Sequence, residues 1–127
     1  MDTRKTLLLV DDDPMVLESI DLLLCQTGEF HTIRAHGVTG ALSHLQQARI
    51  DVIVADVILA GSTTGIDLCR DAIARYPTLA IVVITADNEV HGGEIPARGV
   101  FLRKPFGGET LLDAIHAAMQ RAQPDTR

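Results

Sequence analysis

Polar residues that could do chemistry follow four short apolar runs of this 127-residue chain. In chain order these residues are Asp11, Asp12, Asp56, Thr85 and Lys104. If the runs are neighbouring parallel strands, their carboxyl ends share one edge of a sheet, which is where ligands bind in open sheets of this kind. Carboxylates, a hydroxyl and an ammonium group on one edge suit a metal ion and a phosphoryl group.

The three acids have the chemistry of a magnesium site. Mg²⁺ prefers oxygen ligands, keeps several waters and usually takes one or two carboxylates, so Asp12 and Asp56 could bind directly and Asp11 partly through water. Asp56 is also a candidate nucleophile, because a carboxylate can accept a phosphoryl group. Such a transfer needs its phosphoryl oxygens neutralised, a task for Mg²⁺, Lys104 and Thr85.

The elements that must position these residues alternate along the chain. The apolar runs are short and rich in Val, Ile and Leu, which is typical of strands covered on both faces, and residues 31–35 supply one more strand. Amphipathic patterns between and after them predict helices at 14–27, 38–48, 64–76 and 109–122. Asp13 is better explained as the N-cap of the first of these helices than as a metal ligand.

One helix position is interrupted. The segment 87–99 contains Gly92, Gly93 and Pro96, and these residues would leave only a short or distorted fourth helix. The alternation still predicts an α/β fold, a doubly wound five-stranded parallel sheet flanked by helices with right-handed crossovers.

Composition and charge limit the function classes. Residues 1–122 make one domain of ordinary size, and the polar segment 123–127 is a tail or the start of a linker. A net charge of −6 and a pI near 5.2 argue against direct nucleic-acid binding by this segment. No run approaches the ~20 apolar residues of a membrane span, and the polar start is unlike a signal peptide. We therefore expect a cytoplasmic protein without a membrane interaction.

The two cysteines, Cys25 and Cys69, show no metal-binding spacing, and each falls in an apolar helical pattern. We expect both to be buried, reduced thiols.

The chain resembles the receiver domain of bacterial two-component response regulators, including the single-domain chemotaxis regulator. The resemblance extends from Leu7 to about Met119. It implies a flavodoxin-like fold. The motifs that carry it are Leu-Val-Asp-Asp-Asp-Pro at 9–14, Asp56 with Gly65, Thr85-Ala86 and Lys104-Pro105-Phe106.

The resemblance implies a role for each acid. Asp56 is the implied phosphoacceptor, and Asp11 and Asp12 are the acidic pair that binds the metal with it. The backbone carbonyl of Ile58 is the position that completes the metal shell. The implied cofactor is Mg²⁺, with Mn²⁺ able to substitute.

It also implies a conformational switch. Thr85 is the switch hydroxyl and Lys104 the phosphate-binding lysine, while the ring of Phe101 moves inward as the Thr85 hydroxyl approaches the phosphate. An ordinary strand aromatic is the alternative reading of Phe101. The Lys104-Pro105 bond is expected to be cis, in keeping with the low cost of cis before proline.

The function that follows is a phosphoacceptor of a two-component phosphorelay, not a turnover enzyme. Its expected partners are a sensor histidine kinase or a histidine phosphotransfer protein, and an output partner or a second copy in a homodimer. One alternative is a pseudo-receiver that binds partners without phosphorylation. Another is an aspartate-nucleophile phosphohydrolase, although such enzymes carry a second Asp where this chain has Ile58.

Overall fold

The computed structural model describes residues 4–56, 65–85, 99–104 and 106–122. These residues form five strands and four helices. In chain order they are β1 (Lys5–Val10), α1 (Pro14–Cys25), β2 (Phe30–Ala35), α2 (Val38–Gln47), β3 (Val52–Asp56), α3 (Gly65–Arg75), β4 (Ala80–Thr85), β5 (Val100–Arg103) and α4 (Gly108–Ala122).

The strands form one parallel sheet in the order β2, β1, β3, β4, β5. The chain leaves β1 for β2 on one side and then returns to place β3 on the other side, so the order reverses between β1 and β3. Ligands bind at such a reversal point, outside the carboxyl ends of the strands. The predicted doubly wound, five-stranded α/β fold is confirmed.

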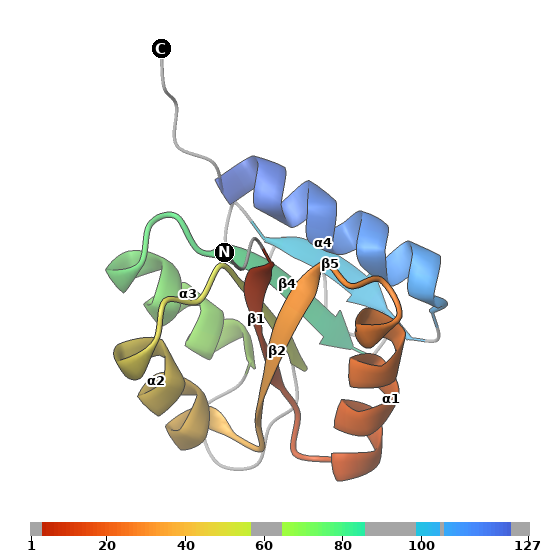
Figure 1. The fold of residues 1–127 in the computed structure, drawn as a ribbon. Coiled ribbons are helices and arrows are strands. Elements are labelled where there is room, and N and C mark those ends of the chain that lie inside the picture. The colour runs from red at the N-terminus through yellow and green to blue at the C-terminus, as the bar shows by residue number, and fades with distance from the viewer. Residues whose placement is uncertain (1–3, 57–64, 86–98, 105, 123–127) are drawn as a thin grey trace.

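The helices cover both faces of the sheet (Figure 1). α1 and α4 pack on one face, and α2 and α3 pack on the other. Alternate residues of β1 serve the two sides, with Leu7 and Leu9 in the first core and Leu8 and Val10 in the second. Because helices cover both faces of the sheet, the strand sequence is an unbroken apolar run rather than an alternation of apolar and polar residues.

The first helix begins and ends where local chemistry predicts. Asp13 is its N-cap, and its Oδ1 accepts the backbone N–H of Met15 at 2.9 Å. Pro14 follows as the first helical residue, where it loses no intrahelical hydrogen bond. Gly28 has a φ of 70° in the turn to β2, a left-handed conformation that favours glycine.

Two predicted segments lie outside the described residues. They are the short or distorted fourth helix, apart from Gly99, and the polar tail 123–127. Within the described ranges, no helix has both the length and the apolar character needed to cross a membrane.

The prediction that both cysteines are buried is wrong for Cys25. Cys69 is fully buried, but Cys25 is exposed at the end of α1, where its thiol donates to Asp21 Oδ1 at 3.5 Å. The inward position of this last turn belongs to the neighbouring Leu24. One residue rotates a helix by about 100°, so a continuous apolar run does not by itself assign the buried face.

We expect iodoacetamide to modify one thiol of the folded chain at neutral to mildly alkaline pH and two after unfolding. Burial raises the pKa of the Cys69 thiol to about 12, so the reactive thiolate is scarce as well as inaccessible. The hydrogen bond to Asp21 raises the pKa of Cys25 too, so its labelling should be slower than that of free cysteine. Mass spectrometry counts the adducts, and Cys25→Ser should remove native labelling. An adduct on Cys69 in the folded chain would contradict this prediction.

Candidate functional site

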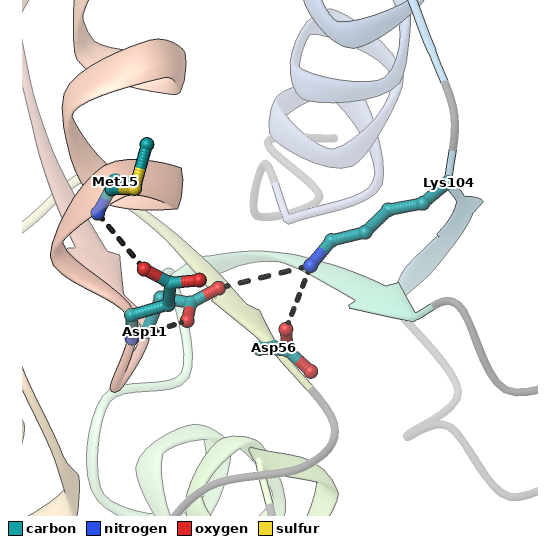
Figure 2. Close-up of polar contacts among 5 residues, drawn as sticks. Asp11, Met15, Asp56 and Lys104 are labelled. Carbon is teal, nitrogen blue, oxygen red and sulfur yellow. Dashed lines mark hydrogen bonds and ion pairs between the residues drawn. The ribbon is translucent and has the colours of Figure 1, made fainter.

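Three of the predicted site residues meet at the carboxyl edge of the sheet. Asp11 follows β1, Asp56 ends β3, and Lys104 follows β5. The Lys104 ammonium nitrogen lies 3.0 Å from Asp56 Oδ2 and 3.9 Å from Asp11 Oδ2. Figure 2 shows the lysine side chain reaching across from β5 to point between the two carboxylates.

The sheet explains this convergence. β1 and β3 are neighbours, with Val10 beside Ala55, so the residues that follow them come out next to each other. β5 is two strands away from β3, and a long side chain is needed to cover that distance. Lysine can do so, and its stem is only partly exposed, with 27% of the side-chain surface accessible.

Asp11 is the only buried charged residue found in the described part of the chain, at 3% exposure. Burial is the largest cause that raises its pKa, from 3.8 to about 6, and the nearby charge of Asp56 acts in the same direction. The backbone N–H of Asp13, which donates to Asp11 Oδ1 at 2.9 Å, and the Lys104 ammonium partly oppose the rise. Two carboxylates and one ammonium therefore leave this edge with an excess of negative charge.

The remaining metal-site predictions are less complete. Asp12 is exposed beside Asp11, and the described residues hold no group of three or more acids, histidines or cysteines arranged around one metal position. Ile58, whose carbonyl is the predicted fourth ligand, lies outside the described residues. The set of Asp11, Asp12, Asp56 and Ile58 thus stays a prediction.

The switch residues fall around β4 and β5. Thr85 ends β4, where its register partner is Arg103, and its side chain is outside the described part. Phe101 is half-buried against the core under α2 and α3. The predicted cis Lys104-Pro105 peptide bond involves Pro105, which lies outside the described residues.

The structure adds a contact that sequence reasoning missed. The Arg103 guanidinium carbon lies 5.6 Å from the centroid of the Phe101 ring, which is a cation–π contact. Residues two apart on a strand share a face, so the spacing of this pair was the available signal.

An apolar groove beside Lys104 was also missed. It has a volume of about 360 Å³ and lies between α1 and the segment after β5. Its lining residues are Met15, Val16, Ser19, Ile20, Leu23, Lys104 and Phe106. Met15, which is 76% exposed, extends the apolar lining of this groove to the surface.

Comparison with known proteins identifies the family. Residues 7–116 match the model of the response regulator receiver domain. The transcriptional regulatory protein AfsQ1 of Streptomyces coelicolor is 34% identical in an alignment of length 125, which covers 95% of this chain and 54% of that protein. The heme response regulator HssR of Staphylococcus saprophyticus is 28% identical over 91% of this chain and 52% of that protein. The chain thus spans about half the length of these relatives.

Solved structures agree with this assignment. A response regulator receiver domain from Clostridium thermocellum superposes with a TM-score of 0.78 at 27% identity, covering 92% of this chain and 95% of the other. The chemotaxis response regulator CheY4 of Vibrio cholerae superposes with a TM-score of 0.78 at 28% identity, covering 91% and 99%. The fold, the polar edge and these matches agree that the chain belongs to the response regulator receiver domain family.

Proposed function

We propose that this receiver accepts a phosphoryl group on Asp56 from a phosphohistidine, with Mg²⁺ as its cofactor. The observation that carries the proposal is the Lys104 ammonium, 3.0 Å from Asp56 Oδ2 and 3.9 Å from Asp11 Oδ2 at the reversal point of the sheet. A nucleophilic carboxylate, a second acid and a cation are thus already together where a phosphoryl donor can reach them.

The transfer forms one bond and breaks another. An Asp56 carboxylate oxygen attacks phosphorus, and the phosphorus–nitrogen bond of the donor breaks with its electron pair going to the imidazole. The phosphoryl oxygens gain a neutralising contact from Lys104, whose ammonium is within hydrogen-bonding distance of Asp56 before the reaction. Because the nucleophile is a carboxylate, the transfer needs no separate general base.

The described acids fit a magnesium ion. Asp11 and Asp56 offer hard carboxylate oxygens. Burial, and after it the nearby charge of Asp56, raises the pKa of Asp11, and a bound cation would favour its ionised form. We assign Asp11, Asp12 and Asp56, with the Ile58 carbonyl, as the residues that would hold Mg²⁺ or Mn²⁺. The ion would neutralise charge on the transferring phosphoryl group.

The response to phosphorylation is assigned to Thr85 and Phe101. The Thr85 hydroxyl would move to the phosphoryl group and the Phe101 ring would follow, shifting an equilibrium between two conformers. A cis Lys104-Pro105 bond belongs to the same proposal. The result is a signal passed to an output module or a second copy of the chain, and not product turnover.

Intact-mass spectrometry tests the proposal. Incubation with acetyl phosphate and Mg²⁺ should add one phosphoryl group per chain, and EDTA should prevent it. Release of phosphate from small esters over many turnovers, without a stable adduct, would favour a phosphohydrolase. Failure to form any adduct, together with no Mg²⁺ affinity, would favour the pseudo-receiver.

This receiver is proposed to act in the cytoplasm. The partner that delivers the phosphoryl group is proposed to be a sensor histidine kinase or a histidine phosphotransfer protein. A protein donor must bring its phosphohistidine to Asp56 past the neighbouring surface. The α1 groove, which shares Lys104 with the site and exposes Met15 at its rim, is the apolar wall of that approach.

We therefore choose a sensor kinase that labels the wild-type chain. With this donor, Met15→Asp should slow phosphotransfer by about tenfold or more, because the new charge would be desolvated in an apolar contact. Labelling by acetyl phosphate should be unchanged, since that donor needs no groove. Met15→Leu, which keeps the apolar surface, is the matched control. Equal loss with both donors would contradict a docking role.

A further inference from the structure

A second hollow lies at the opposite end of the sheet from Lys104. It has a volume of about 530 Å³, within the range of about 300 to 1,000 Å³ typical of small-molecule sites. Its walls come from the start of β1, the connections from α2 to β3 and from α3 to β4, and the last turn of α4. Figure 1 shows these segments converging beside the start of β1.

Backbone hydrogen bonds hold the walls of this hollow in place. Asp51 connects three segments, because its N–H donates to the Thr6 carbonyl at 2.9 Å and its carbonyl accepts the Ala80 N–H at 3.1 Å. The Asp51 side chain adds a third hydrogen bond, in which Oδ2 accepts the Thr6 N–H at 2.8 Å. The hollow is thus formed before any ligand arrives, which lowers the entropic cost of binding.

The charge of the hollow is opposite to that of the chain. Lys5, Arg49 and Arg75 line it, with Asp51 as the one acid among its described lining residues, whereas the whole chain carries a net charge of −6. Arg49 approaches Asp51 at 3.7 Å and is 90% exposed. Within the described part of the chain, Lys5 and Arg75 have no ion-pair partner.

The rest of the lining is largely apolar. Ile50 and Met119 contribute aliphatic surface, and the half-buried Tyr76 adds a ring. Exposed cations beside apolar walls match a ligand that has an anionic group on an apolar body. An inorganic anion would leave the apolar surface uncovered, and a neutral apolar ligand would leave the cations without partners.

We propose that this hollow is a binding site for a small organic anion, with its charged group held by Lys5 and Arg75 and its apolar body against Ile50 and Met119. The site is separate from the Asp56 and Lys104 edge. The unphosphorylated chain should therefore bind the ligand.

The composition of the chain provides a built-in reporter. Tyr76 is the single tyrosine and there is no tryptophan, so intrinsic fluorescence arises inside the hollow. Anilinonaphthalene sulfonate, an aromatic anion, is a suitable probe. Titrating the chain with it should quench Tyr76 emission and sensitise probe emission with one shared midpoint. N-phenylnaphthylamine, the same body without the sulfonate, should bind at least about tenfold more weakly.

Variants locate the bound probe. Replacing Lys5→Ser and Arg75→Ser together should raise the Kd by about tenfold or more, whereas Lys5→Arg with Arg75→Lys should stay within about threefold. These side chains are exposed, so the thermal midpoint should barely change. The proposal is overturned if wild type shows no saturable binding, if the neutral probe binds equally, or if Met15→Ser in the α1 groove, rather than the cation pair, removes the sensitised emission.

Discussion

Asp56→Asn should lose the phosphoryl adduct completely under conditions in which wild type gains one group per chain. The amide nitrogen and oxygen cannot replace an ionised carboxylate as the nucleophile. The fold should survive, because the asparagine oxygen can still accept a hydrogen bond from Lys104, which donates to Asp56 Oδ2 at 3.0 Å in the wild type. Intact-mass spectrometry after treatment with acetyl phosphate and Mg²⁺ measures the adduct, and circular dichroism checks the fold.

Asp67→Asn is the matched control for that loss. Asp67 is an acid of the first turn of α3 that is half exposed and lies 3.7 Å from Arg70. It should be labelled as fully as wild type. Retention of the adduct by Asp56→Asn, with peptide mapping to another acid, would refute Asp56 as the phosphoacceptor.

Asp11→Asn should stabilise the metal-free fold at neutral pH. The pKa of Asp11 is raised on folding from 3.8 to about 6, so its ionised form is less favourable in the folded than in the unfolded chain. The wild type therefore loses stability as the pH rises through this window, while Asn, which can still accept the Asp13 N–H, does not. The advantage of Asp11→Asn should be about 2 kcal/mol larger near pH 7.5 than near pH 4.5.

Urea unfolding in EDTA at the two pH values measures this difference. Asp67→Asn serves again as the control, because it removes an acid that is half exposed rather than buried. Adding Mg²⁺ should reverse the order, since a ligand that binds only the folded state stabilises it and Asp11→Asn lacks one carboxylate for the ion. An Asp11→Asn variant that is less stable than wild type in EDTA near pH 7.5 would show that ionised Asp11 stabilises the fold.

Local patterns were sufficient for much of this molecule. The apolar runs mark strands because both faces of the sheet are covered, and Asp13 with Pro14 marks the start of α1 because capping depends on near neighbours. The strand ends then indicated which acids and which lysine could share one edge. The family resemblance added roles for Ile58, Thr85 and Phe101, and those roles remain predictions.

Other features depend on how one segment covers another. The exposure of Cys25 was missed because a helix with apolar residues around much of its last turn does not reveal which of them faces the sheet. The hollow at the far end was missed for a related reason. Lys5, Arg49 and Arg75 lie far apart in the sequence and line one hollow only after the strand starts are brought together.

The sequence by itself determined the order of strands and helices and the chemical types at the strand ends, because helix and strand periods, caps and turn residues act over a few positions. Only the tertiary structure decided that Lys104 donates a hydrogen bond to Asp56, which lies 48 residues away in the sequence, and that burial of Asp11 raises its pKa to about 6. Distances and burial of this kind depend on strand order, register and the packing of both layers, which no short stretch of the chain contains.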